Sequence, residues 1–256
     1  GLADFESPGG GCLLTDENFG KKMVDWLQPT PGHRLLEPSI GHGAIGRWFP
    51  GTTRNKATEK SFKLTSLAQM NFNGEVTNQP FEDLNVINKF DGIAMNPPFG
   101  KGGKLAYDHV RKALSHLANG GRVVALVPDG PMANKRLDKL LTDESLDNIH
   151  FAAEVSLANG VFERAGTNVK TKIIVLDRFD SEADAPNTQY INFEGAKSVN
   201  ELFERIEGVD LRERNTPTIV EADTTQYMDA ESNPTTDRKG QSQYKIKLYG
   251  YLPNDV

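Results

Sequence analysis

Asn96, Pro97, Pro98 and Phe99 stand together directly after the short apolar run 93–95. Such a run suits a strand that is buried on both faces, and the prolines end it because neither can donate a ladder hydrogen bond. An exocyclic amine on a purine is a poor nucleophile, since its lone pair is delocalised into the ring. The Asn96 oxygen and a proline carbonyl can accept its two N–H bonds, while Phe99 stacks on the ring. The four residues therefore predict a loop that activates a planar amine; the alternative is a structural Pro-Pro turn.

A glycine bend and two acids form the second group of candidate residues. The apolar pair 35–36 predicts a buried strand, and Gly41 and Gly43 predict a tight turn whose backbone can approach a ligand closely. Glu59 follows the next strand candidate and lies 22 residues after Glu37. Doubly wound folds place an acid at about that distance against ribose hydroxyls. The alternatives are a generic strand–turn–helix and an exposed acid at a helix N-terminus.

These motifs, in this order, resemble those of the S-adenosylmethionine-dependent amino-group methyltransferases, above all the adenine-N6 DNA methyltransferases. Asn-Pro-Pro-Phe at 96–99 resembles the catalytic motif of that family, and Glu37-Pro38-Ser39 before Gly-x-Gly resembles its cofactor loop. The resemblance covers about residues 13–178. It implies S-adenosylmethionine as cofactor and methyl transfer to the N6 amino group of adenine in DNA. It also implies that Glu37 meets the positive ammonium or sulfonium end of the cofactor.

The resemblance implies further cofactor contacts, some at positions where this sequence departs from the family pattern. A helix near 15–27 would cover the cofactor, but Thr15 is followed by aspartate rather than proline; an ordinary packing helix is the alternative. Family members carry Asp-Phe where this chain has proline and phenylalanine at 80–81, which leaves the adenine contact to Glu82, Asp83 or the backbone. The predicted cofactor residues are Thr15, Glu37, Ser39, Gly41, Gly43, Glu59, Phe81, Asp83 and Asn96.

Phe162 lies in a loop before the expected last, antiparallel strand at 171–176. The resemblance implies that its ring holds an extruded base on the face away from Phe99. Alternatively, the ring packs under the loop.

Charge and composition restrict the class of protein. The net charge of −6 argues against a general nucleic-acid binder, which usually has a basic footprint. Local cations can still bind phosphate in a salt-dependent manner, although ordinary solvated faces are the alternative. A single cysteine excludes an internal disulfide, and no apolar run reaches about 20 residues. We expect a cytoplasmic protein with no metal and no membrane helix. The predicted nucleic-acid rim consists of Lys101, Lys104, Lys135, Arg136 and Arg164.

The sequence predicts a Rossmann-like α/β fold: a mostly parallel sheet with helices on both faces and an antiparallel strand near its end. A helix is expected from about 105 to 118, ended by the glycines that follow Asn119. Residues 1–179 would form the catalytic domain, and residues 180–256 a small acidic extension that packs on it or binds a partner. Because this extension is small for reading bases, we expect target recognition to need an additional domain or subunit.

Alternatives remain for the function. The same loop serves methylation of RNA bases and of a glutamine side chain in proteins, and the sequence does not distinguish these substrates from DNA. From a different class, the chain is a non-catalytic cofactor-fold subunit that positions a partner. The intact motif at 96–99 speaks against that alternative, because a scaffold has no need of an amine-activating loop.

Overall fold

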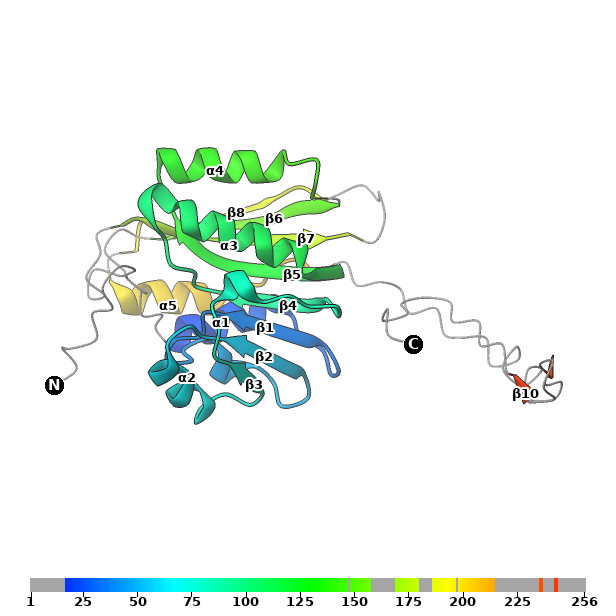
Figure 1. The fold of residues 1–256 in the computed structure, drawn as a ribbon. Coiled ribbons are helices and arrows are strands. Elements are labelled where there is room, and N and C mark those ends of the chain that lie inside the picture. Colours follow the sequence, from blue (N-terminus) through cyan, green and yellow to red (C-terminus); the bar gives the residue numbers. More distant parts are fainter. Residues whose placement is uncertain are drawn as a thin grey trace. The chain divides into compact units, whose positions relative to one another are not determined.

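The computed structural model describes residues 17–146, 148–157, 169–179, 186–196, 198–214, 235–236 and 242–243. The chain divides into two units, Gly1–Asn215 and Thr216–Val256. The first unit contains an eight-stranded sheet and its helices (Figure 1). The described part of the second unit is a pair of short antiparallel strands, β9 (Thr235–Thr236) and β10 (Ser242–Gln243).

The strand order of the large sheet is β3-β2-β1-β4-β5-β7-β6-β8. Strands β1 to β5 are parallel, and within this sheet β7 runs opposite to both of its neighbours. The chain moves outward from β1 in one direction, then returns to β4 on the other side, so a topological switch point lies between β1 and β4. This confirms the predicted fold class. The strands are β1 (Arg34–Pro38), β2 (Arg54–Thr58), β3 (Glu75–Thr77), β4 (Phe90–Met95), β5 (Leu117–Pro128), β6 (Ile149–Ser156), β7 (Thr171–Arg178) and β8 (Gln189–Asn192).

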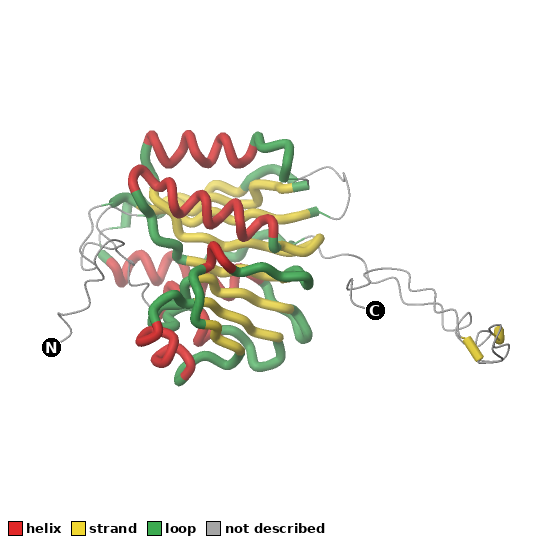
Figure 2. The backbone as a smooth tube through the Cα atoms, viewed as in Figure 1, coloured by secondary structure: helices red, strands yellow, loops and turns green. Residues whose placement is uncertain are grey.

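Helices cover both faces of the sheet (Figure 2). Side chains of a strand alternate between its faces, so β5 feeds two cores: Val124 and Leu126 enter one, and Val123 and Ala125 the other. Helices α1 and α5 contribute to the first core, and α3 and α4 to the second. The helices are α1 (Glu17–Leu27), α2 (Phe62–Gln69), α3 (Lys104–Ser115), α4 (Pro131–Leu141) and α5 (Val199–Glu207), with the short 3-10 helices η1 (Gly46–Trp48), η2 (Phe81–Asp83) and η3 (Lys101–Gly103).

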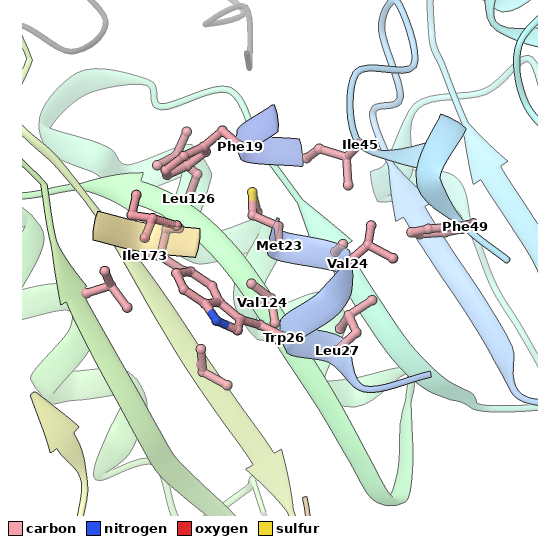
Figure 3. Close-up of a cluster of buried hydrophobic side chains, with 14 of the residues drawn as sticks. Phe19, Met23, Val24, Trp26, Leu27, Ile45, Phe49, Val124, Leu126 and Ile173 are labelled. Atoms are coloured by element: carbon pink, nitrogen blue, oxygen red, sulfur yellow. The ribbon is translucent and has the colours of Figure 1, made fainter. Parts of the chain in front are cut away.

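Helix α1 forms because its apolar residues repeat at helical spacing. Phe19, Met23 and Leu27 recur every fourth residue and are at most 1% exposed, and Trp26 widens the same face (Figure 3). The helix ends before Pro29, as the sequence predicts. Since this face packs on β4 and β5, α1 lies directly over the middle of the sheet.

The end of α3 differs from the prediction. The helix stops at Ser115 rather than near residue 118, and β5 begins at Leu117. Leu117 pairs with Phe90, but the next pair joins Gly92 to Arg122, so residues 119–121 bulge out of the ladder. The glycines expected to cap a helix thus form a strand irregularity, and the buried Leu117 before them pairs with β4.

Residues 186–214 belong to the first unit. β8 pairs with β6 at the sheet edge, and α5 packs near α1. The segment after α5 runs past the end of α1, where the Trp26 indole N–H donates to the carbonyl of Val209 at 3.1 Å and the Gln28 amide to that of Leu211 at 3.1 Å. The boundary between the two units, after Asn215, therefore lies later in the chain than residue 180, where the amino-acid composition changes.

No helix in the described part of the chain has the length and apolar character that crossing a bilayer requires.

Candidate active site

The register of the sheet brings the two predicted groups of residues to one edge. Glu37 pairs with Ala57 across β1 and β2, and Leu36 pairs with Ile93 across β1 and β4. Continued beyond the strand ends, these ladders place Ser39, which follows β1, between Glu59, which follows β2, and Asn96, which follows β4. The ends of β1, β2 and β4 therefore meet at the switch point, where open α/β sheets bind ligands.

The side chains of Glu37 and Asn96 share one face of the sheet. Leu35 and Ala94 lie in the core on the α1 side. Two residues further along each segment, the alternation directs Glu37 and Asn96 to that same side. The acid and the amide thus lie two register positions apart, on the face of the sheet that α1 covers.

The glycine bend, residues 39–46, follows β1 in a conformation that L side chains rarely adopt. Ser39, Gly41 and Gly43 have φ angles of 63°, 55° and 78°. Beyond Gly43, no heavy atom lies within 4 Å of the position that a Cβ would take. The bend therefore leaves open space beside its backbone, as a loop that wraps a small ligand requires.

The buried carboxyl group of Glu37 has surroundings that suit a bound cation. It is 3% exposed, and burial raises the pKa of its carboxyl well above the usual range. The charge of Glu59 raises this pKa further, whereas the Gly46 N–H and Arg47 lower it. The Oε2 atom of Glu37 is buried without a hydrogen-bond partner. A bound positive group would compensate for this burial, so the position fits the ammonium or sulfonium of S-adenosylmethionine.

Glu59 connects the bend to β2. Its Oε2 accepts the Gly41 N–H at 3.0 Å, and its Oε1 accepts the Ser61 N–H at 2.8 Å. The Asn78 amide donates to the Glu59 carbonyl at 2.8 Å, which fixes the backbone at this point. Each carboxylate oxygen can accept a second hydrogen bond, so the residue can still receive ribose hydroxyls.

The proline loop, residues 96–103, follows β4. Asn96 is 8% exposed and Pro97 is buried, while Pro98 is half-buried. Phe99 is half-buried against the core on the α1 side, and its carbonyl accepts the Ala106 N–H at 3.3 Å. The amide, the prolines and the ring are thus held between the sheet edge and the start of α3.

Three left-handed glycines shape the rest of this loop. Gly100, Gly102 and Gly103 have φ angles of 65°, 59° and 76°. The half-buried Arg136 of α4 donates its Nε–H to the Gly102 carbonyl at 3.0 Å. Of the predicted rim cations, Lys101, Lys104 and Lys135 are exposed, and Lys104 pairs with Asp108 at 2.6 Å.

Phe81 lies in a different environment from the other predicted cofactor residues. It is 1% exposed in the core under α3, where its ring meets the rings of His109 and His116 edge-on at 5.4 Å and 6.0 Å. Asp83 is exposed at the end of η2. The position of Phe81 favours a packing role, and the adenine contacts of both residues remain predictions.

Thr15, Phe162 and Arg164 lie outside the described residues. Their predicted roles in cofactor, base and phosphate binding remain predictions.

Gly20 contributes to the site, although the sequence analysis did not select it. A Cβ on this α1 residue would lie 2.2 Å from the Ala44 carbonyl oxygen, so only glycine lets the helix meet the glycine bend. A buried glycine in the middle of an amphipathic helix lowers helix stability, and this could have signalled the close contact.

Among the described residues, no group of three or more His, Cys, Asp or Glu side chains is arranged to hold a metal ion.

Comparison with known proteins agrees with this geometry. The sequence profile described as N-6 DNA methylase matches residues 52–242. A class I S-adenosylmethionine-dependent methyltransferase from Listeria monocytogenes has a similar structure, with a TM-score of 0.59, 14% identity, and coverage of 77% of this chain and 72% of that one. These observations identify the fold as that of S-adenosylmethionine-dependent methyltransferases. A search of the curated proteins finds no match.

Two further similar structures come from restriction-modification systems. The type I methyltransferase subunit from Streptococcus thermophilus has a TM-score of 0.59 and 18% identity, over 80% of this chain and 55% of that one. The modification subunit of a type I restriction enzyme from Vibrio vulnificus has a TM-score of 0.55 and 16% identity, over 91% of this chain and 58% of that one. The chain thus spans little more than half the length of these subunits.

Proposed function

Because this chain belongs to the N-6 DNA methylase family, we propose that it transfers a methyl group from S-adenosylmethionine to the N6 amino group of adenine in DNA. One observation carries the proposal: the Asn-Pro-Pro-Phe motif follows β4 at the switch point, next to the strand that leads into the glycine bend. A loop that would activate an amine and an acid that would compensate a cation therefore lie at the same edge of the sheet, which supports methyl transfer from a sulfonium to an amine.

We assign the cofactor to the glycine bend and its two acids. Glu37 would hold the positive end, and Glu59 would accept the ribose hydroxyls. The buried, unpartnered oxygen of Glu37 supports this assignment, because a cation at that point would relieve the burial of its charge. S-adenosylmethionine supplies an electrophilic methyl group on sulfur.

We assign the adenine to the proline loop. The side-chain oxygen of Asn96 and the backbone carbonyl of Pro97 or Pro98 would accept the two N–H bonds of the exocyclic amine, and Phe99 would stack on the base. This grip would direct the nitrogen lone pair at the methyl group of the bound cofactor, whose sulfur would keep the electron pair of the broken bond. The methylated nitrogen would then lose one proton to water. Most of the rate enhancement would come from positioning, since no side chain must remove a proton before attack.

The similar structures from restriction-modification systems support a DNA substrate and a protein partner. The chain matches only part of each such subunit, so we propose that an additional domain or subunit selects the target sequence. A DNA substrate also implies a cytoplasmic enzyme.

The test is incubation with methyl-labelled S-adenosylmethionine and, separately, duplex DNA, single-stranded DNA, RNA and protein. Digestion and mass spectrometry of the product should identify N6-methyladenine in DNA alone. Calorimetry of cofactor binding is run in parallel, with Asn96→Ala as the matched variant. Label in glutamine or in RNA would contradict the substrate, whereas cofactor binding without any product would contradict the enzyme and favour a non-catalytic subunit.

A further inference from the structure

We propose that Arg136 is a positioning residue for the proline loop and not a phosphate contact. This inference rests on the proposed function and reassigns one of the cations of the predicted rim. Arg136 is half-buried and donates to the Gly102 carbonyl at 3.0 Å, whereas Lys135, the preceding residue on α4, is exposed. Two adjacent cations on one helix therefore have different surroundings, and only Lys135 is presented to a nucleic acid.

The proline loop depends on α4 because its own backbone is weakly constrained. Glycines occupy three of the four positions after Phe99, and a glycine-rich segment has more conformational freedom than any other. Within the loop, the Gly103 N–H donates to the Gly100 carbonyl at a length of 3.3 Å. Contacts from outside must therefore supply much of the order that keeps Asn96 and Phe99 in place.

The start of α4 and the end of β5 supply those contacts. A Cβ on Gly103 would lie 3.3 Å from Pro128 and 3.4 Å from Ala133, so this glycine is enclosed between the two elements. A Cβ on Gly102 would lie 2.8 Å from the terminal carbon of Met132. Arg136 lies one turn further along α4 and adds the polar contact to the same peptide unit. Residues 132–136 thus form a support for the loop.

The hydrogen bond from Arg136 is of a strong type. Its donor is charged, and such bonds are roughly twice as strong as neutral ones. The side chain also lines a pocket of about 310 Å³ between α3 and α4, together with Tyr107, Asp108, Arg111, Lys139, Leu140 and Asp143. The hydrogen bond to the Gly102 carbonyl and the packing in this pocket hold the side chain against the loop.

The experiment compares Arg136→Met, Arg136→Lys and Lys135→Gln with the wild-type protein on the same duplex DNA. Methionine keeps the length of the side chain but cannot donate to the Gly102 carbonyl. We expect Arg136→Met to lower kcat about tenfold or more, because a small displacement of a substrate-positioning element costs much of the rate. Its cofactor Kd and the salt dependence of its DNA binding should equal those of the wild type. Arg136→Lys should restore part of kcat, since an ammonium can also donate to the carbonyl.

Lys135→Gln is the matched control for phosphate contact. It should weaken DNA binding and reduce the slope of log K against log salt concentration by about 0.9. A reduced salt slope with unchanged kcat in Arg136→Met would overturn the positioning role. Circular dichroism and the Tm of each variant show whether it has a folding defect. If the first Arg136 variant has one, the kcat of Arg136→Lys decides whether Arg136 positions the proline loop.

The result also distinguishes failure of the inference from failure of the proposed function. If the wild-type protein yields no methyladenine, the proposed function is contradicted, and the salt slope of Arg136→Met still decides whether Arg136 contacts phosphate. If the wild-type protein is active and Arg136→Met has an unchanged kcat, only the positioning role is contradicted.

Discussion

The glycine bend and the proline loop lie at the same edge of the sheet, but the helices beside them contact them in different ways. Helix α1 meets the bend with its backbone: Gly20 approaches the Ala44 carbonyl so closely that a Cβ would lie 2.2 Å from its oxygen. Helix α4 meets the loop with side chains, because Met132 and Arg136 reach out to Gly102.

This difference matches the ligands that the two regions would bind. Every cofactor molecule presents the same chemical groups, and a close backbone contact suits a site with one geometry. A base attached to a nucleic-acid strand arrives in more varied positions. Long side chains can change rotamer, so the loop can adjust while the bend stays fixed. Four variants test this contrast.

The largest effect is expected for Asn96→Ala. The substitution removes an acceptor that acts on the amine during the reaction, so kcat should fall by about 10²- to 10³-fold. The cofactor Kd should change less than about threefold, since the glycine bend is intact. Single-turnover methylation and calorimetry measure the two quantities. An equal loss of kcat and of cofactor affinity would show that the proline loop and the glycine bend do not act independently.

Gly20→Ala should strongly weaken cofactor binding. The new methyl group meets the Ala44 carbonyl, which has no freedom to move, so α1 or the glycine bend must shift. We expect the cofactor Kd to rise about tenfold and the Tm to fall, because overpacking costs about 1–3 kcal/mol. Trp48, in η1 directly after the bend, provides a fluorescence signal for the shift.

Gly208→Ala is the matched control for Gly20→Ala. A Cβ at Gly208 would meet no heavy atom within 4 Å, so neither cofactor affinity nor Tm should change appreciably. An unaltered cofactor Kd in Gly20→Ala would show that the bend tolerates displacement, contrary to the proposed contrast.

Glu37→Gln should stabilise the free protein and weaken cofactor binding. Burial raises the pKa of Glu37, so its stabilising contribution is present at low pH and is lost as the pH rises through the folded-state pKa. At pH 8 the glutamine variant should therefore melt about 2–4 °C higher, which corresponds to about 1 kcal/mol for a protein of this size. The difference should vanish towards pH 4, where the wild-type acid is protonated in both states.

Saturating cofactor should reverse this order. Its positive end would favour the ionised Glu37, so the wild type should gain more in Tm than the variant does. Scanning calorimetry across pH, with and without cofactor, measures both effects. A higher Tm for the wild type at pH 8 without cofactor would contradict the role of Glu37 as an uncompensated buried acid.

Gly102→Ala should have the smallest effect. The left-handed φ of 59° costs a non-glycine residue about 1–2 kcal/mol, but the flexible end of Met132 can move away from the new methyl group. We expect kcat to fall about two- to threefold with an unchanged cofactor Kd. A loss as large as that of Gly20→Ala would show that the loop is as rigid as the bend.

A prediction for the chemistry of the site could be made because its signals are local in sequence. Asn96 and Phe99 are separated only by two prolines, and Gly41 and Gly43 by one residue. The alternation of buried side chains then fixed the faces of the strands, which brought Glu37 and Asn96 to the same side.

Residues whose role depends on distant partners could not be predicted in this way. The ring of Phe81 is apolar whether it meets a ligand or a core, and only the fold places His109 and His116 beside it. In the sequence, Lys135 and Arg136 are both basic residues of one predicted helix and cannot be told apart by role. In the structure, Arg136 is the one of the two that donates to the Gly102 carbonyl. The sequence around residues 208–214 is polar, and its hydrogen-bond donors Trp26 and Gln28 lie 183 positions earlier.

Those long-range hydrogen bonds affect how the protein matures during synthesis. Arg122 in the sheet binds Asp177 through two hydrogen bonds of 2.6 Å and 2.8 Å and also donates to the carbonyls of Trp26 and Arg212. A nascent chain that ends before residue 207 already contains Arg122 and Asp177, but it lacks the carbonyls to which Trp26 and Gln28 donate. Helix α1, which meets the glycine bend through Gly20, is therefore made first, and its last hydrogen bonds can form only after nearly the whole first unit has been synthesised.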